Sequence, residues 1–259
     1  MTDNPQPRGG TLRREDPLLD IENLRVSFGA LDAVAGVDLA VSAGEVVGLI
    51  GPNGAGKTSF LDGVSGIVRA TGRVVLAGRE ISSLPPYARV GAGLSRTFQT
   101  SEVVHDLTIA EIIGLIAPWW RKNPLDVDSP GKELLNRVVE ELRLSQVLDR
   151  TLVEVTSGIR RCVGVAAAVA TQPVAILFDE PAAGLTAEEK DELTRIIRFL
   201  GEYGLGVLVV DHNVGFIANA CDYVHMMHLG KVVFSGLPDE MFSSHVVDEF
   251  YLAGSAGEQ

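Results

Sequence analysis

The sequence predicts an α/β fold in which helices cover both faces of a mainly parallel sheet. Two continuous apolar runs, Val174–Phe178 and Gly206–Val210, are typical of strands that are buried on both faces. Segments with apolar residues at helical spacing alternate with these runs along the chain. A glycine-rich stretch, Gly51–Ser59, also joins an apolar run to a helical pattern. Because strands that alternate with helices usually pair in parallel, these features favour a parallel sheet between two layers of helices.

The N-terminal part of the chain carries a polar tail followed by strand patterns. Residues 1–18 are rich in proline, glycine and charged residues, and we expect them to be disordered. Arg73–Ala77, with a glycine on each side, predicts a strand that ends in a turn. Alternating apolar residues predict two earlier strands with one face toward the core, through Leu24, Val26 and Phe28 and through Val37, Leu39 and Val41.

A helical insert is predicted in the middle of the chain, at about residues 100–157. It comes after Leu84-Pro85-Pro86, a segment that we expect to become helical near Tyr87. Within the insert, one face of a predicted helix is apolar and carries Leu134, Leu135, Val138 and Leu142. We therefore expect a single folded domain over residues 19–254 that includes this insert, with a short tail at 255–259.

Beyond the insert, the chain returns to alternating strands and helices. Thr186 and Glu189 have the spacing of a capping box, in which each residue satisfies a backbone N–H group of the other. Apolar residues at helical spacing follow, so a helix is predicted to begin just after Thr186. Lys231–Ser235 predicts a last, exposed strand.

Composition narrows the classes of partner. The net charge of −12 disfavours a nucleic-acid partner, because binding to phosphates needs a basic face. Cys162 and Cys221 lie in apolar surroundings without metal-ligand spacing, which indicates buried thiols in a reducing compartment. The N-terminus has no apolar signal region, and the longest apolar run, Val163–Phe178, is interrupted by Thr171-Gln172-Pro173. We expect a soluble, cytoplasmic protein.

The glycine-rich stretch has the pattern of a phosphate-binding loop. Glu45–Ile50 before it predicts a buried strand, and a helical pattern follows it, so backbone N–H groups and a helix N-terminus would converge on an anion. Lys57 would reach the terminal phosphates of a nucleotide, and the Thr58 hydroxyl would be placed for Mg²⁺. The predicted nucleotide-binding residues are Gly51, Pro52, Asn53, Gly54, Ala55, Gly56, Lys57, Thr58 and Ser59.

Two predicted strands end in residues that could act on a bound nucleotide. Asp179 and Glu180 follow one strand, and Asp211-His212 follows the next. Alone, a strand that ends in two carboxylates is more often helix-capping chemistry, and a single histidine is more often structural. The carboxyl ends of parallel strands form the ligand-binding edge of a sheet, here beside the phosphate loop. We therefore expect Asp179 to hold Mg²⁺, Glu180 to act as a base and His212 to contact the γ-phosphate.

Four stretches together resemble the ATP-binding subunit of an ABC transporter: Gly51–Ser59, Ser95–Gln99, Phe178–Leu185 and Asp211-His212. The resemblance covers about Ile21 to Gly254. It implies a P-loop NTPase core with an N-terminal antiparallel β subdomain and a helical insert subdomain. Among subfamilies, the chain is most similar to the ATP-binding subunits of branched-chain amino-acid importers, on the basis of residues 96–99, 170–173, 180–185 and 247–254. Urea and amide importers use closely similar subunits.

The resemblance also implies roles for residues that the patterns alone do not assign. Phe28 matches the aromatic residue that stacks on adenine. Gln99 matches the glutamine that contacts Mg²⁺ and water, and the segment from about Thr100 to Leu107 matches the region where a permease helix docks. Such subunits act as dimers, in which each ATP lies between the phosphate loop of one chain and the signature motif of the other. The signature positions that would bind the partner's ATP are Thr156, Ser157 and Gly158.

The signature is where the chain departs from the family. The family motif Leu-Ser-Gly-Gly-Gln corresponds here to Val155–Ile159. Ser157 stands in place of a glycine and Ile159 in place of the glutamine. Ala167 stands where the family often has arginine, and Thr186 where it usually has Asp or Asn. Because the chain's own phosphate loop and acidic residues are intact, these changes affect what it offers to a partner. We predict a heterodimer with two unequal ATP sites.

The resulting expectation is an ATPase subunit of an importer that binds ATP and Mg²⁺. Its expected partners are a second ATPase subunit, integral membrane permease subunits and, indirectly, a substrate-binding protein, which would place it on the inner face of the cell membrane. A regulatory subunit with weak hydrolysis remains open because of the altered signature. A non-transport ABC ATPase is disfavoured by the acidic charge and by the lack of a second cassette or a long coiled-coil insert. A general P-loop kinase would leave Gln99 and His212 without a role.

Overall fold

The computed structural model describes residues 16–97, 106–117 and 130–243. Its centre is a six-stranded sheet with the order β10-β9-β3-β8-β7-β6. All neighbouring strands in it pair in parallel except β10, which pairs antiparallel with β9 at one edge. The strands are β3 (Val46–Ile50), β6 (Leu94–Thr97), β7 (Ala175–Asp179), β8 (Gly206–Val210), β9 (Tyr223–His228) and β10 (Lys231–Gly236). The prediction of a mainly parallel sheet is confirmed.

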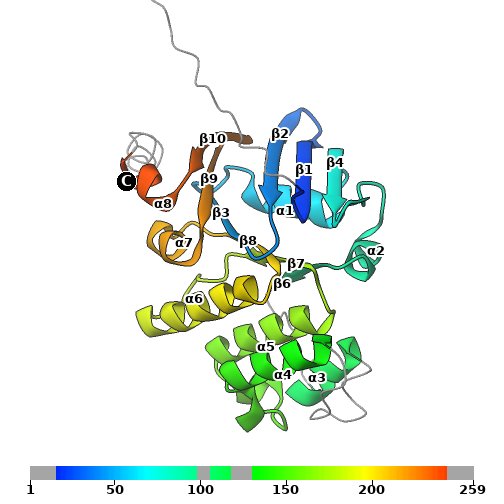
Figure 1. Cartoon of the computed structure of the whole chain (residues 1–259), viewed down its shortest axis with the longest axis vertical. Coiled ribbons are helices and arrows are strands. Elements are labelled where there is room, and N and C mark those ends of the chain that lie inside the picture. The colour runs from blue at the N-terminus through cyan, green and yellow to red at the C-terminus, as the bar shows by residue number, and fades with distance from the viewer. Residues whose placement is uncertain (1–15, 98–105, 118–129, 244–259) are drawn as a thin grey trace, which may run out of the picture.

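A second, antiparallel sheet with the order β2-β1-β4-β5 lies above the first in Figure 1. It is built from β1 (Leu19–Phe28), β2 (Leu31–Val41), β4 (Thr71–Leu76) and β5 (Arg79–Glu80), with α1 (Lys57–Ser65) beneath it and α2 (Pro86–Gly91) at its side. The strands predicted through Leu24 and Val37 are therefore present and form an antiparallel pair.

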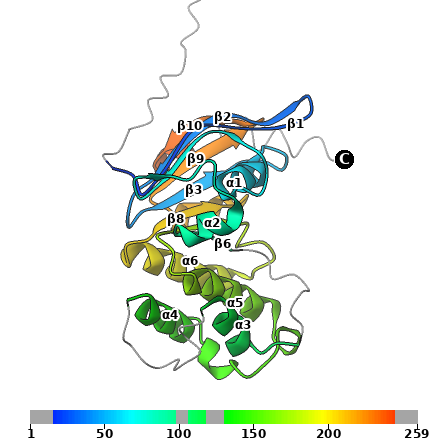
Figure 2. The ribbon, with the colours of Figure 1, turned by 90° about the vertical axis from the view of Figure 1, so that its right-hand side faces the viewer.

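A third group of elements is helical and lies below the parallel sheet (Figures 1 and 2). It contains α3 (Ile109–Ile116), α4 (Pro130–Glu141), η1 (Leu144–Gln146), η2 (Leu152–Glu154) and α5 (Ser157–Ala170). The four apolar residues predicted to share a face of α4 and its C-terminal end are all buried. α6 (Ala187–Glu202), α7 (Val214–Ala220) and α8 (Pro238–Ser243) complete the described chain. The domain limits given above remain predictions.

The central strands β3 and β8, and β7 apart from its last residue, are apolar because each face of the sheet has its own core. In β3, Val47 and Leu49 belong to the core that includes α1 and the antiparallel sheet. Val46 and Ile50 belong to the other core, which includes the helices of the third group and α6. Successive side chains on a strand point to opposite faces, so a strand between two cores has no polar face.

Among the described elements that the sequence patterns did not predict are β6, α7 (Val214–Ala220) and β9. β6 reads Leu-Ser-Arg-Thr, so it lacks an apolar run, and it is held by its parallel pairing with β7. Its buried Ser95 accepts a hydrogen bond from Thr171 at 3.2 Å, which compensates for placing a hydroxyl in the interior. β9 contains the buried His225, whose Nδ1 forms a hydrogen bond of 2.7 Å with the Ser235 hydroxyl.

Both cysteines are reduced in this fold and are shielded. Cys221 is buried and Cys162 is partly buried. Burial raises the pKa of the Cys162 thiol to about 11 and also raises that of Cys221, so both stay protonated near neutral pH. Among residues 16–97, 106–117 and 130–243, none of the helices has the length and apolar character needed to cross a membrane.

Candidate active site

The phosphate loop of the sequence joins β3 to α1, as predicted. Gly56 precedes the first residue of α1 with a φ of 103°, and a Cβ atom there would lie 2.1 Å from the carbonyl oxygen of Ala33. Only glycine fits this position, because the backbone of β2 presses against the loop. The first turn of α1 has no acidic side chain, so its N–H groups and the positive end of the helix dipole face the loop uncompensated. The loop is therefore shaped to hold an anion.

Lys57 supplies the fixed positive charge of this loop. Its side chain is buried, and Nζ donates hydrogen bonds to the carbonyl oxygens of Gly51 at 2.7 Å and Pro52 at 3.0 Å. Burial lowers the pKa of Lys57, and the negative charges of Glu180, Asp211 and Asp179 oppose that lowering. The ammonium group thus lies between the loop carbonyls and the acidic ends of two neighbouring strands.

Those strand ends meet beside the loop because β7 and β8 are adjacent and parallel. The backbone N–H of Glu180 donates to the carbonyl of Val210 at 2.7 Å, which continues the ladder by one residue beyond β7. Glu180 has a φ of 44°, in the left-handed region that side chains other than glycine rarely adopt. The hydrogen bond to Val210 holds this turn of the chain, and the Glu180 carboxylate stays about one third exposed, at 34%.

Asp211 fixes the two loops that follow these strands. Its side chain is fully buried; Oδ2 accepts from the N–H of Ala182 and Oδ1 from the N–H of Asn213, each at 2.9 Å. His212 is half exposed, and its Nδ1 lies 3.9 Å from Oε1 of Glu180 and 3.7 Å from Oδ1 of Asp211. The structure thus brings Glu180 and His212 together, while Asp211 orders the backbone around both. The sequence patterns gave Asp211 no role of its own.

Asp179 has one carboxylate oxygen engaged and one available. Oδ2 accepts a hydrogen bond from Arg96 at 2.6 Å. Within the described part of the chain, Oδ1 is buried and has no hydrogen-bond partner. A buried, unsatisfied carboxylate oxygen beside a phosphate loop fits a Mg²⁺ ligand. No group of three or more His, Cys, Asp or Glu residues among the described residues could hold a metal, so Mg²⁺ here would take its other ligands from Thr58, phosphate and water.

The signature positions lie on a different part of the molecule from the phosphate loop. Thr156 caps α5, and its Oγ1 accepts from the N–H of Ile159 at 3.4 Å. Thr156 and Ser157 are exposed, and α5 belongs to the lower helical group, whereas α1 lies above the parallel sheet (Figures 1 and 2). Ile159 is partly buried against the helical core, which gives its apolar side chain a reason within this chain. The N-terminus of α5 is open to another molecule.

Two further predicted residues have contrasting positions. Phe28 is 52% exposed at the end of β1, on the hairpin whose second strand contacts the phosphate loop through Ala33. An exposed ring there is free to stack on a base. Gln99 and most of the segment from Thr100 to Leu107 lie outside the described residues.

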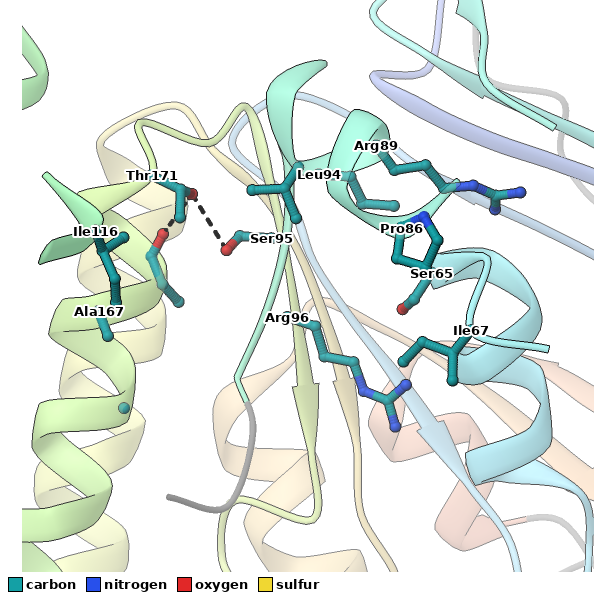
Figure 3. Close-up of a pocket in the computed structure, with 13 residues that line it drawn as sticks. Ser65, Ile67, Pro86, Arg89, Leu94, Ser95, Arg96, Ile116, Ala167 and Thr171 are labelled. Atoms are coloured by element: carbon teal, nitrogen blue, oxygen red, sulfur yellow. Dashed lines mark hydrogen bonds between the residues drawn. The ribbon is translucent and has the colours of Figure 1, made fainter. Parts of the chain in front are cut away.

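Beside β6 is a cavity of about 520 Å³ between the phosphate-loop side of the molecule and the helical group (Figure 3). Its walls come from α1, α2, β6, α3 and α5. The lining includes Ile67, Val90, Arg96, Ile116 and Ala167. Ile67, Val90 and Ile116 are exposed apolar side chains, and Tyr87 of α2 is also exposed, at 80%. An apolar cavity with such a rim is suited to receive a protein segment.

Comparison with known proteins identifies similar ATP-binding proteins of ABC transporters. A family model described as ABC transporter matches residues 34–183. The lipopolysaccharide export system ATP-binding protein LptB of Haemophilus influenzae is 35% identical over 243 residues, covering 93% of this chain and 98% of LptB. The branched-chain amino acid transport ATP-binding protein BraF of Pseudomonas aeruginosa is 30% identical over 253 residues, covering 91% and 98%. The ADP conformation of MJ1267, an ATP-binding cassette of an ABC transporter, matches with a TM-score of 0.80 and 28% identity, covering 91% and 98%.

The buried charge of Lys57 leads to a testable separation of stability from binding. Because its pKa in the folded chain is below 10.5, folding disfavours the charged form, and this cost is largest at pH values below the folded pKa and fades as the pH rises through it. We expect Lys57→Met to raise the melting temperature of the nucleotide-free protein at pH 7 and to abolish ATP binding. The gain should shrink as the pH rises toward 10.5. Thermal denaturation and nucleotide titration measure the two effects.

The control for this variant is Lys231→Met, which removes an exposed lysine and should change neither property. A Lys57→Met protein that melts earlier than the wild type would contradict the burial argument.

Proposed function

The chain belongs to the ABC transporter family as an ATP-binding subunit, and we propose that it is the ATP-hydrolysing motor of an importer for branched-chain or other small amino acids or amides. The observation that carries the motor function is the convergence of Lys57, Asp179, Glu180 and His212 around one helix N-terminus. The importer assignment is supported by the residues 96–99 and 180–185 and by the likeness to BraF along nearly the whole chain.

In the proposed mechanism, the loop amides and Lys57 bind the β- and γ-phosphates, and Phe28 stacks on the adenine ring. Thr58 and Asp179 would hold Mg²⁺, together with Gln99. Mg²⁺ would neutralise charge on the phosphate oxygens. The Glu180 carboxylate takes the proton of a water molecule whose oxygen bonds to the γ-phosphorus, and the bond from that phosphorus to the oxygen of ADP breaks. His212, whose Nδ1 is 3.9 Å from Glu180 Oε1, orients this carboxylate and contacts the γ-phosphate.

A second subunit is needed to complete each ATP site. In this chain, Thr156 and Ser157 at the start of α5 are exposed, and α5 lies below the parallel sheet while α1 lies above it (Figure 1), which supports use of that surface by a partner's nucleotide. Ile159 replaces the glutamine of the family motif and packs against the helical core of its own chain, so the surface at the start of α5 lacks that amide. One uncharged hydrogen bond contributes about 1 kcal/mol, so the site built with this signature would be weakened. We therefore favour a heterodimer with unequal sites.

The permease is proposed to dock at the cavity beside β6. The segment from about Thr100 to Leu107, which matches the docking region of the family, follows β6 in the sequence, and the cavity is lined by the exposed side chains of Ile67, Val90 and Ile116. A helix from the membrane subunit with an apolar face would cover these side chains. Through that subunit the chain would be peripheral to the inner face of the membrane, and a substrate-binding protein would be reached only indirectly.

A second candidate function is the motor of an export system. It is favoured by the identity to LptB, which at 35% exceeds the 30% identity to BraF over a comparable length. The two candidates share the ATPase chemistry and differ in the permease. Reconstitution in vesicles with each type of permease separates them, because only the cognate membrane subunit should stimulate ATP hydrolysis by this chain.

Glu180→Gln tests the proposed base. The amide keeps the size of the side chain but cannot accept the proton, so ATP binding should remain while turnover falls by about 10²–10⁴-fold. Single-turnover hydrolysis and a binding titration, both with the partner subunits present, measure this. Glu202→Gln, on the exposed end of α6, is the matched control and should turn over normally. Normal hydrolysis by Glu180→Gln would remove Glu180 from the mechanism.

The heterodimer is tested by ATPase activity of the chain alone and with candidate partner subunits. We expect no hydrolysis alone and activity when a partner with a complete signature is added, with Lys57→Ala as the blank. In the assembled pair, activity should depend on Glu180 of this chain more than on the partner's corresponding carboxylate. Hydrolysis by the chain alone would mean that Val155–Ile159 works as a signature in a homodimer, and the asymmetric arrangement would be wrong.

Ile67→Glu tests the docking surface. A carboxylate placed in an apolar contact is costly to bury, so permease-stimulated ATPase activity should fall by at least about tenfold. Nucleotide binding by the isolated chain should be unchanged, because Ile67 lies outside the phosphate loop. Phe242→Glu adds the same charge on α8, at the opposite side of Figure 1 from α2, and should leave stimulation intact. Equal loss with both variants would count against this surface.

A further inference from the structure

We propose that Arg96 is a positioning residue that orients Asp179 for Mg²⁺ and fixes it to the helix that follows the phosphate loop. This inference rests on the proposed function, since it assigns Asp179 to the metal. Arg96 Nη2 lies 2.6 Å from Oδ2 of Asp179, and Nη1 lies 2.6 Å from Oδ1 of Asp62. The side chain of Arg96 is only 7% exposed, and those of Asp62 and Asp179 are 25% and 21% exposed. One guanidinium group thus joins two carboxylates that come from different elements.

The fold places Arg96 between these carboxylates. In the parallel ladder Arg96 pairs with Leu177, so its side chain is on the face of the sheet that α1 covers. Leu94, two residues earlier, is buried in the same core as Leu177. Figure 3 shows the Arg96 side chain extending from β6 toward α1, whose last residue is Ser65. Asp62 lies on the same helix.

The geometry limits how Asp179 can turn. With Oδ2 engaged by Arg96, the carboxylate is held with Oδ1 as the oxygen that has no partner among the described residues. A planar guanidinium fixes a carboxylate more firmly than a flexible ammonium can, because its N–H groups have fixed directions. Groups that hold a metal ligand in this way typically change metal affinity by about 10–100-fold when removed. Arg96 would therefore act on the metal through Asp179 without touching it.

The charge of Arg96 has a second effect. Asp62 and Asp179 are two partly buried acids that share one cation, and removal of that cation would break an ion pair of each. Asp179 would then be free to rotate and to gather water. We therefore expect loss of Arg96 to weaken Mg²⁺ binding more than it weakens the binding of the nucleotide itself, which depends on Lys57 and the loop amides.

Arg96→Met tests this inference in the full chain. The readout is binding of a fluorescent ATP analogue, titrated once in EDTA and once against increasing Mg²⁺. We expect the affinity in EDTA to stay near the wild-type value, while the Mg²⁺ concentration for half-maximal effect rises by about 10–100-fold. Excess Mg²⁺ should restore the full wild-type effect of Mg²⁺ on nucleotide binding, which it would not do if Arg96 only stabilised the fold. Arg96→Lys keeps the charge without the fork and should give an intermediate shift.

Two controls accompany this variant. Arg73→Met removes an exposed arginine whose partners are Glu22 and Glu80, and it should leave the Mg²⁺ requirement unchanged. Asp62→Asn loosens Arg96 without touching Asp179 and should shift the requirement in the same direction but less. If Arg96→Met does not fold, Arg96→Lys and Asp62→Asn carry the test.

An unchanged Mg²⁺ requirement in Arg96→Met would overturn the role of Arg96, and so would an unchanged requirement in both Arg96→Lys and Asp62→Asn. An equal loss of binding in EDTA and in Mg²⁺ would overturn it too, because that result indicates only a structural role. If instead the wild-type chain bound no ATP, or bound it with no effect of Mg²⁺, the proposed function itself would be at fault.

Discussion

The parallel pairing of β3, β8 and β7 is the constraint on which the rest of the site depends. Leu49 and Asp179 both lie opposite Val210 in the sheet, so the three strands end at one level. Two backbone hydrogen bonds continue the ladder just past the strands, from Glu180 to Val210 and from Asp211 to Leu49. The loop after β3 and the acids after β7 and β8 are neighbours for this reason, although long stretches of sequence separate them.

Charge compensation is the second organising feature. An acidic chain places two buried cations, Lys57 and Arg96, at the edge of the sheet where its carboxylates gather. Lys57 can change its hydrogen-bond partners, since it now donates to loop carbonyls that a phosphate could replace. Arg96 is committed to two carboxylates. One cation is thus available to a ligand, while the other belongs to the framework that presents the ligand site.

Local signals were enough to predict much of this arrangement. β8 was predicted with its observed limits from an uninterrupted apolar run, and the capping box of α6 from the spacing of Thr186 and Glu189. The contact of Arg96 with Asp62 and Asp179 could not be predicted in this way, because β6 has no strand pattern and the three residues meet only through the packing of α1 on the sheet. The sequence patterns also could not explain why residue 159 is isoleucine, since its packing against the helical core is a tertiary contact.

The backbone of Glu180 has a consequence for how this protein can change. A residue with a side chain and a φ of 44° carries a conformational cost on the order of 1–3 kcal/mol, which glycine would not carry. Stability and chemistry therefore favour different residues at this position. Variants selected only for resistance to heat would tend to drift toward glycine there and lose the carboxylate, so the identity of residue 180 would report which of the two pressures a lineage or a laboratory selection had experienced.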